Sequence, residues 1–143
     1  MVWNGLKAEN SPASYFNASR KRYIIKLLMA KHLLRIRAVD RKFFNAIRFD
    51  EKTIETRAAT DKFRLIKPGD ILKFICGKDV LEKKVLKAYH FKNIDGLIKS
   101  LEIKKIIPFA SSLEEAKKIW FGFPDYKEKI KKYGLVAFEL ENK

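Results

Sequence analysis

The segment that decides the fold reads Asp50-Glu51-Lys52-Thr53-Ile54-Glu55-Thr56-Arg57. It places a lysine, a glutamate and an arginine within a few residues, where a predicted helix gives way to a predicted strand. Strand alternation from Thr53 puts Glu55 and Arg57 on one face, with Lys52 at the entrance. A glutamate two residues before an arginine on one strand face can hold the guanidinium in one rotamer, so that its remaining donors point at a phosphate or a base edge. The alternative is a solvated strand edge with a surface ion pair, which contributes little to stability.

The residues on either side predict alternating strands and helices. Before the segment, residues 33–39 alternate as a half-buried strand, and Asp40 caps a helix over residues 41–47 that buries Phe43, Phe44 and Ile47. After it, Pro68-Gly69 predicts a turn before a buried strand over residues 71–76. A hairpin turn at residues 77–79 leads to a long strand, in which the residues predicted to share one face are Leu81, Lys83, Val85, Lys87, Tyr89 and Phe91.

The last third of the chain predicts short helices followed by a closing strand. Asn93 starts a helix to about Leu101, and Ser111 and Ser112 with Glu114 and Glu115 form overlapping capping boxes for the next. A further helix opens at residues 124–125 and ends at Gly134, before a strand that closes at residues 136–140.

These residues resemble the ASCH domain family, whose signature is Gly-x-Lys-x-x-Glu-x-Arg. Lys52, Glu55 and Arg57 match three of the four fixed positions, and Asp50 stands where the family has glycine. That position follows a helix end, where a left-handed residue is wanted and Asp is a tolerated substitute. The likeness covers about residues 31 to 141. It implies an α+β fold with a small mixed β-barrel of the PUA-like type and short helices packed over one side.

The chain divides into a basic N-terminal extension, residues 1–30, and an ASCH-like domain, residues 31–143. From Ser19 the pattern predicts a short basic amphipathic helix, so we expect the extension to be partly helical. A membrane-surface helix and a secretory signal are alternatives, but Lys26 interrupts the short apolar run. The extension either has its own purpose or reflects a start codon chosen before Met29.

Charge predicts a polyanionic partner. The chain has a formal net charge of +15 and a pI of about 9.9. Residues 1–32 hold six basic and one acidic residue, a net of +5, which leaves +10 for the remaining residues. The domain is therefore basic without its extension, although a lysine-rich proteome is a competing explanation.

Cysteine and histidine content predicts neither a metal site nor a cofactor. Cys76 is the only cysteine and lies within an apolar strand pattern, so it reads as a small buried residue. With His32 and His90 as the only histidines, a zinc site is not supported. Apolar runs are too short to span a bilayer, so we expect a cytoplasmic protein without a membrane partner.

The leading functional hypothesis is binding of RNA or a nucleotide-like ligand in a basic cleft lined by Lys52, Glu55 and Arg57. Nucleic-acid binding needs cations for phosphates and flat groups for unstacked bases. Trp120 reads as a core residue, because its helical register with Leu113 and Ala116 points inward. The further binding candidates are Arg48, Arg64, Lys67, Phe121 and Phe123.

The alternative hypothesis is a hydrolase that acts on a modified nucleoside, or a ribonuclease. Some family members resemble amidohydrolases that deacylate modified cytidine with a threonine nucleophile beside the signature lysine and a later glutamate. Here Glu55 and residues 107–109 occupy those places, so two of three parts are absent. In an enzyme, Lys52 would stabilise an oxyanion and Glu55 would act as a general base, although Arg57 lowers the same pKa. A third reading is a protein-interaction module.

Overall fold

The structure is a computed structural model and describes residues 29–142. The part from Lys31 onward forms one compact unit. The predicted helix from Ser19 lies outside the described residues. The strands are β1 (Lys31–Arg35), β2 (Ile54–Ala58), β3 (Ile71–Cys76), β4 (Asp79–Phe91) and β5 (Leu135–Leu140). The helices are η2 (Ala38–Asp40), α3 (Arg41–Arg48), α4 (Asp61–Arg64), α5 (Ile94–Ser100), α6 (Ile103–Ile106), α7 (Leu113–Gly122) and α8 (Tyr126–Tyr133).

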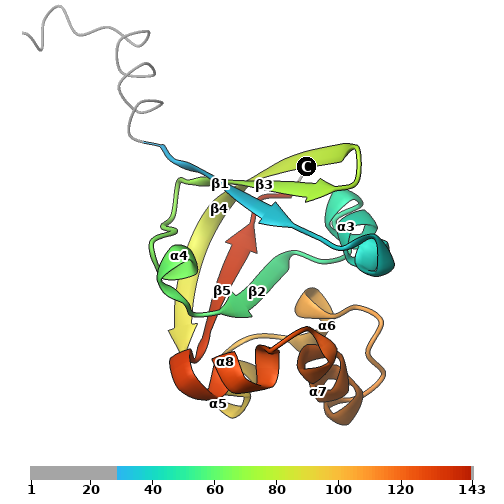
Figure 1. Cartoon of the computed structure of the whole chain (residues 1–143), viewed down its shortest axis with the longest axis vertical. Coiled ribbons are helices and arrows are strands. Elements are labelled where there is room, and N and C mark those ends of the chain that lie inside the picture. Colours follow the sequence, from blue (N-terminus) through green and yellow to red (C-terminus); the bar gives the residue numbers. More distant parts are fainter. Residues whose placement is uncertain (1–28, 143) are drawn as a thin grey trace, which may run out of the picture. The chain divides into compact units, whose positions relative to one another are not determined.

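The five strands form one curled sheet in the order β1-β3-β4-β5-β2 (Figure 1). β1 runs parallel to β3, and the other neighbours are antiparallel. The α+β class and the mixed sheet are therefore confirmed. Among the described residues no ladder joins β1 to β2, so the curled sheet is a half-barrel with two edges, which fits the predicted small mixed barrel without closing it.

A β-bulge divides β4 and corrects one prediction. The pairing with β5 passes from Val85 opposite Leu140 directly to Lys87 opposite Glu139, so β4 holds an extra residue between them. An extra residue shifts the alternation by one position. Val85 consequently faces one side of the sheet, whereas Tyr89 and Phe91 pack on the other. The prediction that alternate residues from Leu81 to Phe91 share one face was wrong for the residues after the bulge.

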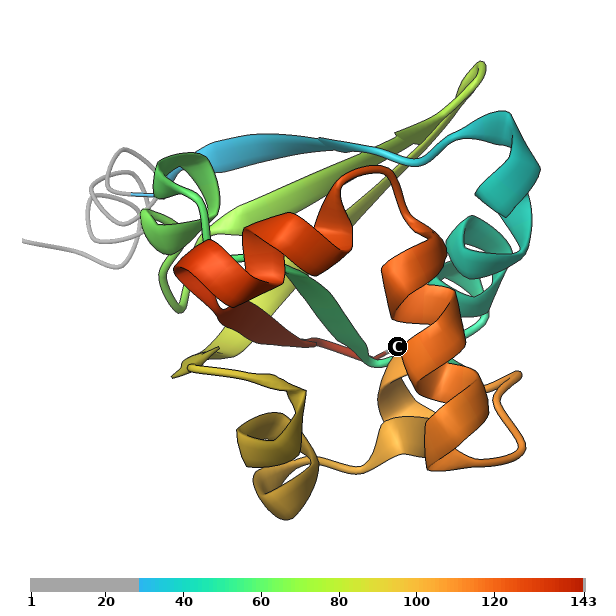
Figure 2. The ribbon, with the colours of Figure 1, turned by 60° about the horizontal axis from the view of Figure 1, so that its bottom comes forward.

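Each side of the sheet covers its own core. One cluster gathers Leu34, Phe44, Phe74 and Phe138. The other contains Trp120 and Phe43, together with buried residues from β2, α5, α6, α8 and β5. Figure 2 shows α8 in front of β2, and α6 and α8 contact that strand. The inward orientation of Trp120 is confirmed, since only 1% of the residue is exposed.

Most predicted helix ends are confirmed. The Asn93 side chain accepts from the Gly96 N–H, and the Ser112 side chain accepts from the Glu115 N–H. The carboxylate of Glu115 accepts from the N–H of Ser111 rather than from that of the cap residue. Asp40 stands at the start of α3 but makes no side-chain cap there, and its Oδ2 atom accepts from Arg37.

Asp50 has the left-handed backbone conformation that its place after α3 predicted, with φ of 61°. Its carboxylate lies 2.6 Å from the Nζ atom of Lys83, which is 2% exposed and belongs to β4. A buried ammonium requires a charged partner. Asp50 therefore supplies what a glycine at this position could not.

We expect Asp50→Asn to lower the free energy of unfolding by about 1–3 kcal/mol, because the buried Lys83 loses its charged acceptor. Asn tolerates the left-handed conformation, so the backbone contributes little to the change. Asp125→Asn is the matched control, since Asp125 is also left-handed, with φ of 60°, but is exposed. Urea unfolding of both variants measures the difference, and equal losses would contradict the role given to the pair with Lys83.

Candidate functional site

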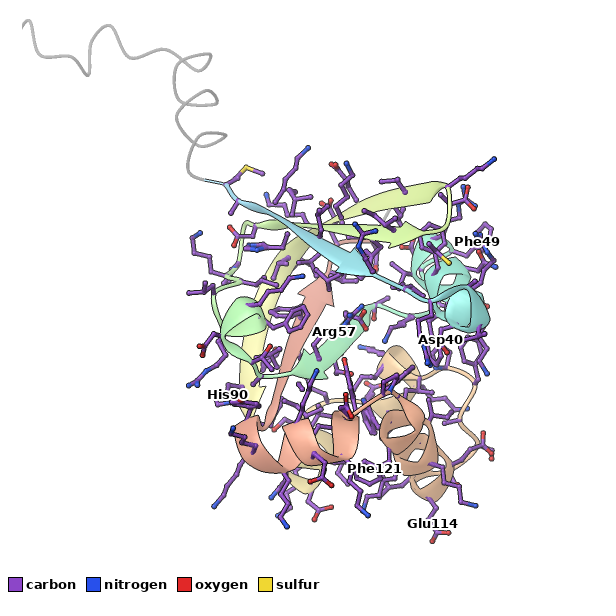
Figure 3. All side chains as sticks on the ribbon, in the orientation of Figure 1. Asp40, Phe49, Arg57, His90, Glu114 and Phe121 are labelled. Atoms are coloured by element: carbon purple, nitrogen blue, oxygen red, sulfur yellow. The ribbon has the colours of Figure 1, made fainter. Side chains whose placement is uncertain are left out.

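A cavity of about 180 Å³ lies beside β2, between the end of β1 and the α7–α8 turn. Arg57 extends from β2 on one side of this region, and Asp40 lies at the start of α3 (Figure 3). The cavity brings together the three signature residues with aromatic and further charged side chains. Its lining residues are Arg35, Ile36, Arg37, Asp40, Phe43, Lys52, Glu55, Thr56, Arg57, Ile107, Trp120, Phe123, Pro124 and Tyr126.

Glu55 is the centre of a buried charge cluster. Its Oε1 atom lies 3.2 Å from Lys52 Nζ and accepts from the N–H of Thr56 at 3.1 Å. Its Oε2 atom accepts from Arg57 Nε at 3.3 Å and from Arg57 Nη2 at 3.1 Å. Each oxygen thus has two donors, which uses the acceptor capacity of the carboxylate.

Lys52 makes three contacts through its Nζ atom and is 4% exposed. It donates to the carbonyl of Ile54 at 2.9 Å and to that of Ile106 at 2.6 Å, and Glu55 is the third partner. Three acceptors match the three protons of an ammonium. Burial lowers the pKa of Lys52, and the charge of Glu55 opposes that effect. The ammonium connects β2 to the end of α6 and leaves no proton for a ligand.

The pKa of Glu55 lies below its ordinary value. Burial alone raises it, but the charges of Lys52 and Arg57 and their hydrogen bonds outweigh that effect. The carboxylate is therefore ionised at neutral pH. A carboxylate with this pKa is a poor general base.

Arg57 is fixed on one side and open on the other. Its Nε and Nη2 groups contact Glu55, and Nη2 also lies 3.5 Å from the carbonyl oxygen of Arg35 on β1. Burial lowers the pKa of Arg57, but the charge of Glu55 reverses the shift, and the group remains a cation. Within the described residues, its Nη1 group donates to no protein acceptor. Arg57 therefore lines the cavity as a guanidinium whose orientation is fixed by Glu55 and whose Nη1 group can still donate to a ligand.

Aromatic rings form another wall. The ring of Phe123 lies 5.7 Å from that of Phe43 and 5.3 Å from that of Tyr126, both edge to face. Burial raises the pKa of Tyr126 to about 12, so its hydroxyl keeps its proton at neutral pH. Behind this wall, Trp120 Nε1 donates to Thr56 Oγ1 at 3.0 Å. The wall presents flat apolar surface to a ligand.

Three charged side chains line the side of the cavity nearest β1 and η2. Arg35 and Arg37 are both exposed. Arg37 Nε donates to Asp40 Oδ2 at 2.7 Å, and the guanidinium carbon of Arg37 lies 5.9 Å from the centre of the Phe123 ring. The lining residues together contain four cations and two carboxylates, so the cavity has a net positive charge.

The structure brings Lys52, Glu55, Arg57 and Phe123 together but not the other predicted site residues. Arg48 lies over the ring of Phe44, and Lys67 pairs with Asp70 at 3.0 Å. None of Arg48, Arg64, Lys67 or Phe121 lines this cavity. Phe121 instead lines a second hollow with Ile94 and Ile130. Its position follows from the helix, because a neighbour of the inward Trp120 is rotated by about 100°.

Asp40 was missed as a lining residue. Reading it as a helix cap hid its pairing with Arg37 three residues earlier, although that spacing is itself a common ion-pair signal.

Other chemistry finds little support in the described part of the chain. No group of three His, Cys, Asp or Glu residues there could hold a metal ion. His32 Nε2 lies 2.9 Å from Asp70, and Cys76 is buried. Among residues 29–142, no helix is long and apolar enough to cross a membrane.

Two solved structures resemble this chain closely enough to define its family. Hypothetical protein PH0355 shares 33% sequence identity with a TM-score of 0.68, over 78% of this chain and 97% of that protein. The chain belongs to the PH0355 family. Protein PF0455 from Pyrococcus furiosus shares 31% identity with a TM-score of 0.61, over 78% of this chain and 96% of that protein.

No protein-family model matches the chain, and no curated protein matches it.

Proposed function

We propose that the cavity binds one nucleotide of RNA, or a nucleotide-like ligand, with Arg57 as its principal polar contact. The observation that carries this proposal is the state of Arg57. Arg57 lines the cavity, its Nε and Nη2 groups are held by a buried carboxylate, and its Nη1 group has no acceptor in the described residues. A guanidinium held in this way binds phosphate or a base edge with little loss of side-chain entropy.

The size and walls of the cavity support this ligand class. Its volume of about 180 Å³ is below the roughly 300–1,000 Å³ of pockets for drug-sized ligands, which suits a single base or nucleoside. A base lies against the wall of Phe43, Phe123 and Tyr126. Its phosphates extend toward Arg35 and Arg37, which are exposed.

Lys52 and Glu55 position Arg57 in this proposal and do not act on the ligand. Glu55 could either orient Arg57 or accept from a base amine, and its saturated oxygens favour the first role. The same contacts weigh against the hydrolase hypothesis. Glu55 is held ionised by its neighbours, and Lys52 has no proton to offer an oxyanion.

We also propose that the PH0355 family has the ASCH type of PUA-like fold. Lys52, Glu55 and Arg57 converge as the ASCH signature implies. Asp50, which stands where that signature has glycine, adopts the left-handed conformation that suits a glycine. The half-barrel sheet and the short helices beside β2 are compatible with this assignment.

Salt-sensitive binding of short single-stranded RNA tests the proposal. Two phosphate contacts, at Arg35 and Arg37, predict that affinity falls on the order of 20-fold when salt rises tenfold, because few counterions are released. Fluorescence anisotropy with labelled oligonucleotides from low to moderate salt measures this slope.

The same samples distinguish the competing functions. The protein is incubated with labelled RNA and with N4-acylated cytidines, and product is sought by chromatography. Turnover that Lys52→Ala abolishes would instead establish the hydrolase. If the protein binds neither RNA nor nucleotides at low salt and shows no turnover, the remaining hypothesis is a protein-interaction module.

A further inference from the structure

We infer that the cavity selects guanine, with Arg57 and Asp40 reading the base from different sides. This inference rests on the proposed function and specifies its ligand. It follows from an inventory of the polar groups that line the cavity and are not already engaged by the protein.

Most polar groups of the cavity are used internally. Lys52 has three acceptors, both oxygens of Glu55 have two donors each, and Thr56 Oγ1 accepts from Trp120. Within the described residues, the groups that stay open for a ligand are the Nη1 donor of Arg57, the Oδ1 acceptor of Asp40, the guanidinium of Arg35 and the Nη groups of Arg37. Arg35 and Arg37 are exposed and are assigned to phosphates, so the groups left for the base are one guanidinium donor and one carboxylate acceptor.

Guanine fits this pair better than the other bases do. Its O6 and N7 atoms are adjacent acceptors that match a guanidinium, and its N1–H and N2–H₂ groups are adjacent donors that match a carboxylate. Adenine offers an amine where O6 would face Arg57, and cytosine has no ring N–H for Asp40. Uracil has acceptors and one N–H, but it lacks the second donor.

The surroundings of Asp40 fit a reading role. Asp40 is at the N-cap position of α3 without a side-chain cap, so its carboxylate is not needed to start the helix. Arg37 holds Oδ2 at 2.7 Å and thereby fixes the carboxylate. The rings of Phe43 and Phe123 also line the cavity, where a flat purine can lie between the two charged groups.

Competition between RNA hexamers tests the inference. The probes are uridine-rich hexamers with one central guanosine, adenosine or cytidine, and an all-uridine hexamer. With the full chain we expect the guanosine hexamer to bind about tenfold more tightly than the others, in the lower part of the range for a bidentate base contact. Asp40→Asn is expected to reduce that preference to about twofold, because the amide replaces one acceptor oxygen with a donor.

Asp61→Asn is the matched control, since it removes the same charge from an exposed position in α4. It should preserve the preference. Equal binding of all hexamers that still depends on Arg57 would overturn guanine selection and leave the proposed function standing. Guanosine preference that survives Asp40→Asn would overturn the assignment of Asp40. Failure of every hexamer to bind at low salt would overturn both proposals.

Discussion

Glu55→Gln should lower the free energy of unfolding by about 3–5 kcal/mol, the loss typical of a buried ion pair that is left with one partner missing. Lys52 is 4% exposed, and 16% of the Arg57 side chain is exposed, so both would keep their charges in a poorly solvated place. The new amide would also turn a donor toward Lys52 or Arg57. Chemical denaturation at neutral pH measures the loss.

The pH dependence of this difference has a definite sign. The folded state lowers the pKa of Glu55, so its contribution to stability is complete above the pKa of the unfolded chain and is lost as pH falls through the folded value. The difference between wild type and Glu55→Gln should therefore narrow below about pH 4.5. Glu114→Gln, an exposed change on α7, is the control. If the difference in free energy of unfolding between wild type and Glu55→Gln stays constant between pH 7 and pH 3, the buried charge cluster is contradicted.

Arg57→Ala should weaken RNA binding at least about tenfold, because a hydrogen bond to a charged group contributes about 1.5–3 kcal/mol. Arg57→Lys should recover little affinity, since an ammonium cannot reproduce the planar fork of donors. The lysine variant keeps a cation beside Glu55, so its thermal stability shows whether the fold is retained. Fluorescence anisotropy at fixed salt gives the affinities.

Arg64→Ala is the matched control for this experiment. Arg64 is exposed at the end of α4 and does not line the cavity, so its loss removes the same charge without the contact. Similar losses for the two variants would indicate that RNA responds only to net charge.

Local pattern predicted the charge cluster because its members are close in sequence. Alternation along β2 placed Glu55 and Arg57 on one face. Lys52 lies two residues before the strand and pairs with Glu55. The left-handed conformation of Asp50 was implied by the resemblance, because the signature has glycine at this position after a helix end.

Features that depend on contacts between residues far apart in the chain could not be predicted from the sequence. Alternation placed Lys83 on one face with Leu81 and Val85, but it gave no sign of the partner Asp50, which is 33 positions away. The bulge in β4 has no residue signature and is visible only in the pairing with β5. Phe121 resembled Phe123 as an aromatic candidate, although the turn after α7 brings only Phe123 to the cavity.

The extra residue in β4 affects which changes of sequence the two cores can accept. It lets a single continuous strand contribute Val85 to one core and Tyr89 and Phe91 to the other. Phe43 and Trp120, which line the cavity, belong to the second core, whereas Ile36, which also lines it, packs against the first. Sequence changes in the first core can therefore alter the scaffold while Phe43 and Trp120 keep their neighbours in the second core.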